Sequence, residues 1–133
     1  MPKFSGTVLD SQIIIPVILV NPEDLSKSKT CKGLIDTGST SCSVRENVVK
    51  DLGIKPCGSL SVTLVSGKME ANCYKVLIFF SAPQIKSKEP FEFLQFVTSL
   101  PQEWVEGFDV LIGMSILKKS CFSMKKNKYV FAI

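Results

Sequence analysis

Short apolar runs separated by turn residues dominate the chain, and their lengths are those of strands rather than helices. Three pairs of such runs predict hairpins, because a short segment with turn-forming or polar residues separates the two members of each pair. The predicted hairpins are 6–9 with 12–20, 60–65 with 73–80, and 122–124 with 129–133. Further strands are predicted at 31–35, 91–100 and 108–112. Many short strands predict an all-β fold.

Only two segments have a helical pattern. Apolar residues in 44–52 fall at Val44, Val48, Val49 and Leu52, which is the spacing of one helical face, and Gly53 follows as a stop. Residues 114–119 predict one short helical turn. The polar segments are predicted as loops at 21–29, 82–90 and 101–107. Because no repeat or linker interrupts the chain, residues 1–133 are predicted to form a single domain.

The composition is that of a soluble globular protein, with 45% hydrophobic and 21% charged residues. The longest apolar stretch, 13–20, contains Pro16 and is too short to cross a bilayer. The first residues lack a hydrophobic signal segment, so a cytoplasmic location is expected, without membrane association. The net charge of +4 is modest, and no aromatic-interleaved basic patch accompanies the lysine groups, so nucleic-acid binding is not predicted.

The residue types that are absent narrow the possible chemistry. The chain has no histidine, which excludes Ser-His-Asp and Cys-His catalysis and histidine-ligated zinc. Its five cysteines form no Cys-x-x-Cys pair, so no metal or other cofactor is predicted, and buried free thiols are expected. Acid–base chemistry would therefore depend mainly on carboxylates.

One carboxylate has an unusual position. The run Leu34-Ile35-Asp36-Thr37-Gly38-Ser39 places an acid directly after an apolar strand, where it is poorly solvated and needs hydrogen-bond donors. Gly38 permits a turn that brings its N–H close to the carboxylate, and the hydroxyls of Thr37 and Ser39 are further candidate donors. Far downstream, Val110-Leu111-Ile112-Gly113 forms a hydrophobic strand that ends in glycine and precedes the predicted short helix.

This order of motifs resembles the retropepsin-like aspartic protease family, particularly its small cellular and bacterial members. The shared order is Leu-Ile-Asp-Thr-Gly-Ser, a helix, a glycine-bearing hairpin, two hydrophobic residues with glycine, a short helix and closing strands. The resemblance extends from about Phe4 to Ile133. It implies a closed retropepsin-like β-barrel with one or two short helices, a homodimer, and an active site at the seam between the two copies.

The resemblance also implies roles for individual residues. Asp36 is the expected catalytic residue, and Thr37, Gly38 and Ser39 form the expected active-site loop, in which Thr37 bonds across the dimer axis. The expected flap tip consists of Val65, Ser66, Gly67 and Lys68, and the expected substrate pocket and loop support consist of Leu34, Leu111, Ile112 and Gly113. Two features depart from the family pattern: Ser115 stands where such members often have Asp, and the flap tip has a single glycine.

The chain contains only one Asp-Thr-Gly, whereas peptide hydrolysis by this route needs two carboxyl groups that share a proton. The second carboxyl group is therefore expected from Asp36 of another copy. The resulting prediction is an aspartic endopeptidase that acts on a peptide or protein substrate. Two alternatives stay open: a catalytically inactive retropepsin-like module for dimerisation or peptide binding, and an unrelated β-barrel that binds nucleic acid.

Overall fold

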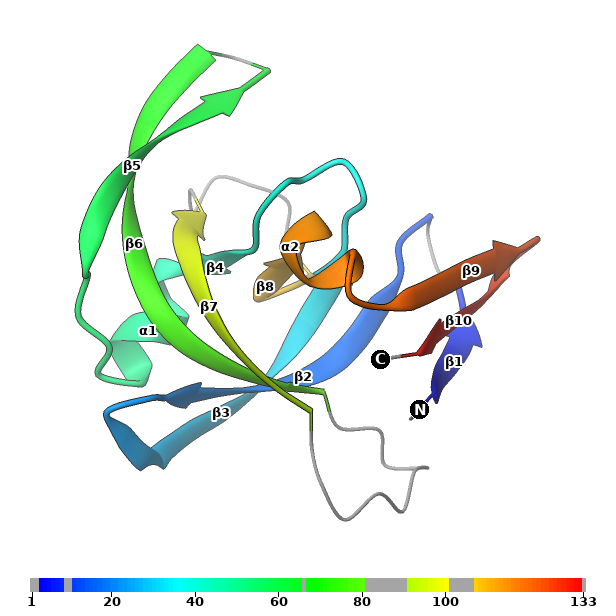
Figure 1. Ribbon diagram of the computed structural model, residues 1–133, viewed down its shortest axis with the longest axis horizontal. Helices are drawn as coiled ribbons and strands as arrows, with labels where there is room; N and C mark the ends of the chain where they lie inside the picture. The colour runs from blue at the N-terminus through cyan, green and yellow to red at the C-terminus, as the bar shows by residue number, and fades with distance from the viewer. Residues whose placement is uncertain (1–2, 9–10, 66, 81–90, 101–106, 133) are drawn as a thin grey trace.

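The computed structural model describes residues 3–8, 11–65, 67–80, 91–100 and 107–132 (Figure 1). Within these ranges the chain is mostly strand, with two short helices. The strands are β1 (Lys3–Thr7), β2 (Ile14–Asn21), β3 (Asp24–Ile35), β4 (Ser43–Arg45), β5 (Gly58–Leu64), β6 (Gly67–Phe80), β7 (Phe91–Leu100), β8 (Val110–Ile112), β9 (Cys121–Lys125) and β10 (Lys128–Ala132). The helices are α1 (Glu46–Asp51) and α2 (Met114–Leu117).

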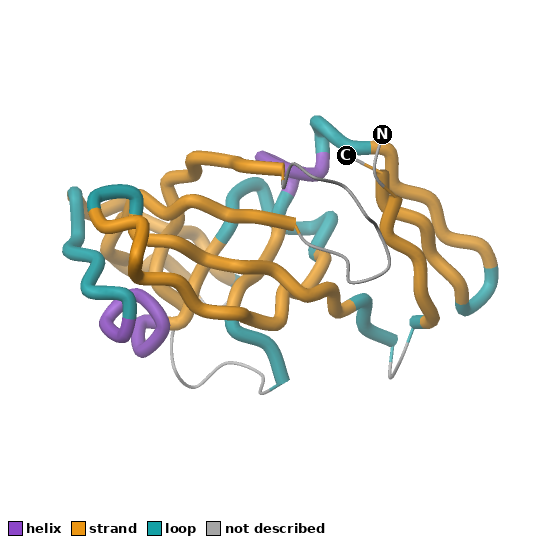
Figure 2. Tube along the Cα trace, turned by 90° about the horizontal axis from the view of Figure 1, so that it is seen from below, coloured by secondary structure: helices purple, strands orange, loops and turns teal. Residues whose placement is uncertain are grey.

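The described strands form two sheets. The larger has the order β2-β3-β8-β4-β7-β6-β5, and β2 also pairs with β6, which curls this sheet around the core (Figure 1). The smaller sheet has the order β1-β10-β9 and lies at one end of the molecule, with both chain termini beside it (Figure 2). The prediction of a mostly β chain with short helices is confirmed, and the described strands are divided between these two sheets.

The predicted first hairpin is wrong. Residues of β1 do not pair with β2 but with β10, in a register that runs from Lys3↔Ala132 to Thr7↔Lys128. β2 pairs instead with β3 over its whole length and with β6 at Val17–Val20, while β1 completes the small sheet beside β10, whose Tyr129 and Phe131 are buried in the core. The other two predicted hairpins are confirmed as β5–β6 and β9–β10.

The predicted loop at 21–29 is also wrong, because β3 begins at Asp24 and pairs with β2. Its first half is polar because it extends beyond the core, where even Leu25 is 69% exposed. An ion pair of 2.7 Å between Lys29 and Asp51 connects this outer half to α1. The predicted helix at 44–52 is shorter than expected: Val44 belongs to β4, and α1 begins at Glu46.

Alternating residues of the central strands build the core. Ile15, Val17 and Leu19 of β2 are almost fully buried, whereas Pro16 between them is exposed, as expected for side chains that alternate between two faces. Phe131 of β10 is fully buried and stacks at a tilt on Phe80, with 5.5 Å between the ring centres. The small sheet is therefore packed against the same core as the large one.

Among the residues that the structure describes, neither helix has the length and apolar character needed to span a membrane.

Candidate active site

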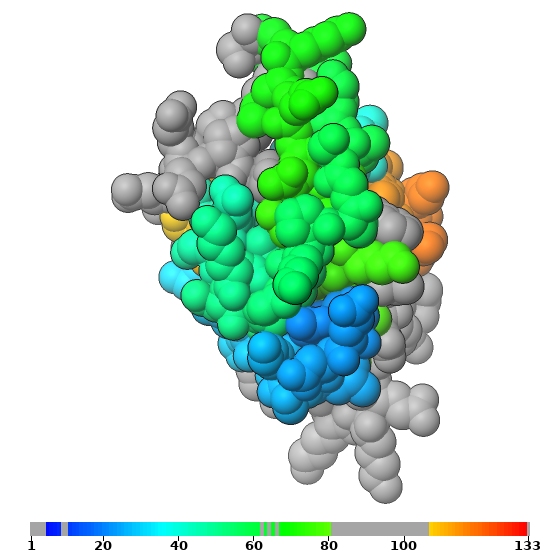
Figure 3. Space-filling view, turned by 90° about the vertical axis from the view of Figure 1, so that its left-hand side faces the viewer, coloured from blue at the N-terminus to red at the C-terminus, as the bar shows by residue number. Residues whose placement is uncertain are grey.

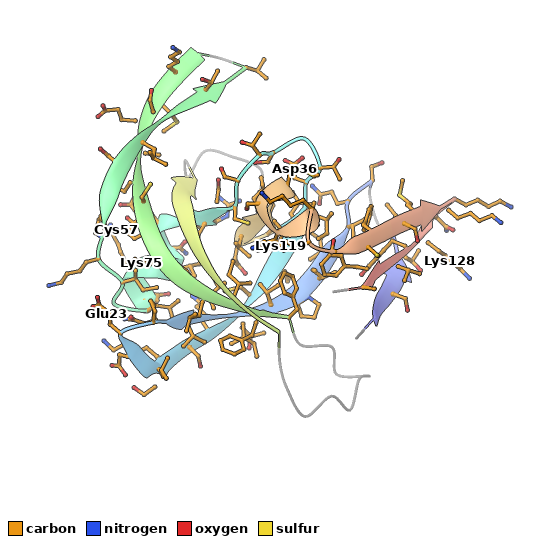
Figure 4. All side chains as sticks on the ribbon, viewed as in Figure 1. Glu23, Asp36, Cys57, Lys75, Lys119 and Lys128 are labelled. Atoms are coloured by element: carbon orange, nitrogen blue, oxygen red, sulfur yellow. The ribbon has the colours of Figure 1, made fainter. Side chains whose placement is uncertain are left out.

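Asp36 directly follows the last residue of β3. At this point β3 lies beside β8, a strand that comes much later in the chain. β3 and β8 pair in parallel, with Gly33, Leu34 and Ile35 opposite Val110, Leu111 and Ile112. β4 then pairs antiparallel with β8, so that the chain loops out between Asp36 and Cys42 and returns to the same strand. Figure 4 shows Asp36 in this loop, between the β5–β6 hairpin on one side and the small sheet on the other.

Backbone hydrogen bonds hold the Asp36 loop (residues 36–42) onto β8 and α2. The N–H of Asp36 donates to the carbonyl of Ile112 at 2.9 Å. From the other side, the N–H groups of Met114 and Ser115 donate to the carbonyls of Ser39 and Thr40, at 2.7 and 3.0 Å. Because each bond joins main-chain groups, the loop geometry is fixed independently of the side chains it presents.

The carboxylate of Asp36 receives one of the donors that the sequence predicts. The N–H of Gly38 donates to its Oδ1 at 2.9 Å. The expected donation from Ser39 is wrong, because its hydroxyl donates instead to the carbonyl of Ser41 at 2.7 Å and so stabilises the turn itself. Thr37 and Gly38 are exposed and Asp36 is half-buried, so the loop presents its acid at the surface of this single chain.

Gly113 is required by the close approach of the loop to α2. A Cβ at this position would overlap the carbonyl oxygen of Ser41 and lie 2.8 Å from the carbonyl oxygen of Ser39. Any side chain at residue 113 would therefore push the Asp36 loop away from the helix. The predicted supporting role of Gly113 has this specific physical basis.

Ser115 and Cys42 meet behind the Asp36 loop. The thiol of Cys42 is fully buried and lies 3.5 Å from the hydroxyl of Ser115, and either atom could be the donor. Burial raises the pKa of Cys42, so the thiol stays protonated at neutral pH. The loop is thus connected to α2 by a neutral side-chain contact in addition to the two main-chain bonds.

The predicted pocket residues divide between two environments. Leu34 and Leu111 face each other across β3 and β8 and belong to a small apolar cluster with Phe108 and Ile14. Ile112 lies in the main core instead, fully buried. Leu34 and Leu111 therefore lie on the face away from the main core, and Ile112 supports the loop from behind.

The predicted flap residues lie at the turn of the β5–β6 hairpin, which projects beyond the body of the molecule (Figure 3). Val65 is fully exposed, and Lys68 is exposed as well. Gly67 has φ +131°, a conformation that L-residues rarely adopt, so glycine is required there. Ser66 lies outside the described residues.

A cavity of about 690 Å³ opens beside Asp36. Its walls come from three segments: the end of β3 with the Asp36 loop, the chain before β2, and the β9–β10 hairpin. The lining residues are Val8, Ser11, Gln12, Ile13, Leu34, Ile35, Asp36, Thr37, Phe122, Met124, Lys126 and Asn127. Of the predicted site residues, the structure thus brings Leu34, Asp36 and Thr37 together in one cavity.

Sequence reasoning missed the part that Asp109 plays. Its carboxylate accepts a hydrogen bond from the N–H of Lys32 at 2.8 Å, and its own N–H donates to the carbonyl of Lys32, also at 2.8 Å. Arg45 adds a bond of 2.6 Å from its Nε to the carbonyl of Phe108. These contacts align β3, β4 and β8 beneath the Asp36 loop. The only sign of this role in the sequence was the position of Asp109, a single acid directly before the apolar run 110–112.

The expectation of buried thiols holds for Cys31, Cys42 and Cys73, whereas Cys57 and Cys121 are exposed. Burial raises the pKa of Cys31 to about 11 and also raises the pKa values of Cys42 and Cys73. Among the described residues, no group of three or more Cys, Asp or Glu side chains could hold a metal ion.

Brief alkylation of the native protein with iodoacetamide at pH 7.5 is expected to modify Cys57 and Cys121 and to spare the three buried thiols. The reason is that alkylation requires an accessible thiolate. Mass spectrometry of the tryptic peptides measures this, and labelling in urea, where all five thiols should react, is the control. Fast native labelling of Cys42 would contradict its burial.

The comparisons with known proteins agree with this geometry at the level of fold. No protein-family model matches the chain, and no curated protein matches its sequence. Among solved structures, the chain is similar to a retropepsin-like aspartic protease from Rickettsia conorii, with a TM-score of 0.64 and 16% sequence identity. The match covers 98% of this chain and 89% of that one. The chain therefore has a retropepsin-like fold, and the predicted resemblance is confirmed.

Proposed function

We propose that this protein is an aspartic endopeptidase whose active site contains Asp36 from each of two identical chains. The single observation that carries the proposal is the placement of Asp36. Its carboxylate accepts the N–H of Gly38, in a loop held between β8 and α2, within a retropepsin-like fold. A half-buried acid in a loop fixed by main-chain bonds and bordered by a cavity is an arrangement suited to catalysis.

The proposed reaction is hydrolysis of a peptide bond by an activated water molecule. One Asp36 carboxylate accepts a proton from the water, and the protonated carboxyl group of the other Asp36 donates a hydrogen bond to the scissile carbonyl. The water oxygen bonds to the carbonyl carbon, and the C–N bond then breaks as the amine nitrogen receives the proton that the first Asp36 took from the water. No metal or cofactor takes part in this scheme.

A homodimer is part of the proposal because the loop supplies one carboxyl group per chain. A two-fold axis places identical residues opposite each other, so the exposed position of Thr37 beside Asp36 suits a contact across that axis. In this arrangement the whole chain acts as a single domain. Its apolar pair Leu34 and Leu111 favours apolar side chains next to the cleaved bond.

The β5–β6 hairpin is proposed to act as the flap over a bound peptide. Such a lid excludes water and holds an extended peptide by main-chain hydrogen bonds. Deletion of residues 66–69 is expected to lower kcat/KM for a peptide substrate at least about 100-fold, as positioning of the substrate is lost. Steady-state kinetics measure this, with thermal unfolding as the control for folding. Kinetics equal to those of the full chain would show that the hairpin is only structural.

The second candidate function is a retropepsin-like module that binds peptides or dimerises without catalysis. The observation in its favour is Ser115, whose hydroxyl meets a neutral thiol where family members often have an acid. Cleavage of an unstructured protein that is inhibited by a pepstatin-type compound supports the endopeptidase. Tight binding of the same compound without any cleavage supports the module.

A further inference from the structure

Two cysteine residues meet where the β5–β6 hairpin joins the body of the molecule. Cys57 directly precedes β5, and its N–H donates to the carbonyl oxygen of Cys73 on β6 at 2.8 Å. The thiol of Cys57 donates to the same oxygen at 3.4 Å. Gly58, the next residue, is the register partner of Cys73. Two successive residues thus lie opposite one residue of the partner strand, which is the arrangement of a β-bulge.

The bulge turns the side chain of Cys57 out of the core. In an uninterrupted ladder Cys57 would lie opposite Tyr74, and residues opposite each other share a face of the sheet. Tyr74 belongs to the buried core cluster, whereas Cys57 is exposed. Cys73 precedes Tyr74 on the strand and so directs its side chain to the outer face of β6. The two thiols therefore lie on the same outer face.

The separation of the two residues suits a disulfide bond. The Cα atoms of residues that lie opposite each other in an antiparallel pair are about 4.5–5.5 Å apart, and disulfides join Cα atoms about 4.4–6.8 Å apart. The thiols also influence each other's ionisation: burial raises the pKa of Cys73, and the neighbouring thiol of Cys57 raises it further. A disulfide therefore needs rotation of the two side chains but no new pairing of the strands.

The two thiols differ in accessibility, and this difference sets the order in which they react. Cys57 is exposed, on the opposite side of the molecule from the small sheet (Figure 4), whereas Cys73 has an exposed fraction of 7%. An oxidant as large as oxidised glutathione can reach Cys57 but not Cys73. Cys57 is therefore the thiol that reacts with the oxidant, and Cys73 is the thiol that displaces the glutathione from Cys57.

We propose that Cys57 and Cys73 form a reversible thiol–disulfide modification site that reacts with small disulfides such as oxidised glutathione. The Cys57 thiolate attacks one sulfur of the oxidant, the S–S bond of the oxidant breaks, and one glutathione leaves with the proton that Cys57 lost. The Cys73 thiolate then attacks the Cys57 sulfur, and the second glutathione leaves with the proton of Cys73. The two glutathione molecules thus carry away the two electrons and two protons that the protein loses. A reducing thiol reverses both steps through the accessible Cys57 sulfur.

Oxidation changes how the hairpin is held to the body. In the reduced protein, main-chain hydrogen bonds join the start of β5 to β6, and the disulfide adds a covalent bond at the bulge. This bond closes a loop from residue 57 to residue 73, which contains the turn between the two strands. A closed loop removes conformations from the unfolded chain and so stabilises the folded hairpin. The inference goes beyond the proposed function, since the bond forms whether or not the hairpin covers a peptide.

Peptide mapping under non-reducing conditions tests the pairing directly. The folded protein is incubated with oxidised glutathione, the remaining thiols are blocked with N-ethylmaleimide in urea, and the chain is digested with trypsin. Cys57 then lies in peptide 51–68 and Cys73 in peptide 69–75, and the disulfide-linked pair of these peptides is the expected main product. Cys121 is the matched control: it is also exposed but lies opposite Ala132 in the register. Cys121 is therefore expected to stop at the mixed disulfide with glutathione.

Thermal unfolding measures the effect of the disulfide on stability. Oxidation is expected to raise the Tm of the natural sequence by at least about 5 °C and to leave the Tm of Cys57→Ser unchanged. The measurement follows removal of glutathione and is made at about pH 5, where few thiolates remain for exchange. Cys57 is exposed, so Cys57→Ser is expected to fold normally. In Cys73→Ser, the mixed disulfide of Cys57 with glutathione should accumulate, because the second step is blocked.

The outcomes decide this inference separately from the proposed function. If Cys57 stops at the mixed disulfide, as Cys121 does, or pairs with any thiol other than Cys73 of its own chain, the site is refuted. Equal shifts of Tm in the natural sequence and in Cys57→Ser also refute it. A protein that forms the disulfide but cleaves no peptide retains the thiol site and refutes the endopeptidase. A protein that cleaves peptides, loses activity in Asp36→Asn and forms no such disulfide retains the endopeptidase and refutes the thiol site.

Discussion

Replacement of Asp36 by Asn is expected to abolish peptide cleavage while the fold and the proposed dimer persist. Asn has the same shape but cannot accept a proton from water, so the rate should fall by at least about 10²–10⁴-fold, the usual contribution of general acid–base catalysis. The amide oxygen can still accept the N–H of Gly38, which lies 2.9 Å from Oδ1, so the loop should keep its conformation. Cleavage of a fluorogenic peptide and sedimentation analysis measure the two effects.

The matched control is Asp51→Asn. Asp51 is an exposed aspartate at the end of α1 that pairs with Lys29 at 2.7 Å, far along the chain from the Asp36 loop. An exposed ion pair contributes at most about 1 kcal/mol, so this variant should retain full cleavage with a small loss of stability. Cleavage by a purified Asp36→Asn sample at the rate of the Asp51→Asn control would remove Asp36 from the mechanism.

Replacement of Gly113 by Ala is expected to have the largest effect on stability. The added Cβ would overlap the carbonyl oxygen of Ser41, which is main chain and cannot move without displacing the Asp36 loop. Overpacking of this kind costs about 3 kcal/mol, and more where the backbone must shift. The urea midpoint should fall without a change in slope, and kcat should fall with it because the carboxylate is displaced.

Gly58→Ala is the control for Gly113→Ala. Gly58 begins β5 and is exposed, and a Cβ added to it would meet no atom within 4 Å beyond its chain neighbours. Its φ lies outside the left-handed region, so alanine should be neutral or stabilise by about 0.4–1 kcal/mol through the unfolded chain. A Gly113→Ala protein as stable as Gly58→Ala would mean that the loop does not approach α2 as closely as the structure shows.

Most strands could be predicted from the sequence because their signal is local. The alternation in β2 and the apolar run of β8 determine which side chains are buried, and the turn-forming residues before Lys68 and at 126–127 predict two hairpins. The polar first half of β3 could not be recognised, since a strand that extends past the core has no buried face to produce a pattern. The partner of β1 was missed for a different reason, because pairing between the two ends of a chain leaves no mark in either segment.

For the candidate site, the sequence by itself determined three features. These are the Asp-Thr-Gly loop, the close approach of the Gly38 N–H to the Asp36 carboxylate that glycine permits, and the exclusion of catalysis by histidine. These are properties of neighbouring residues, and local backbone geometry is enough to establish them. Only the tertiary structure decided that Ser39 serves the turn, that Gly113 is required by Ser41, and that β9 lies beside the cavity of Asp36. The close approach of Gly113 to Ser41 depends on the parallel pairing of β3 with β8, and the place of β9 depends on its pairing with β10; the β3–β8 contact joins residues far apart in the chain, and no local pattern encodes it.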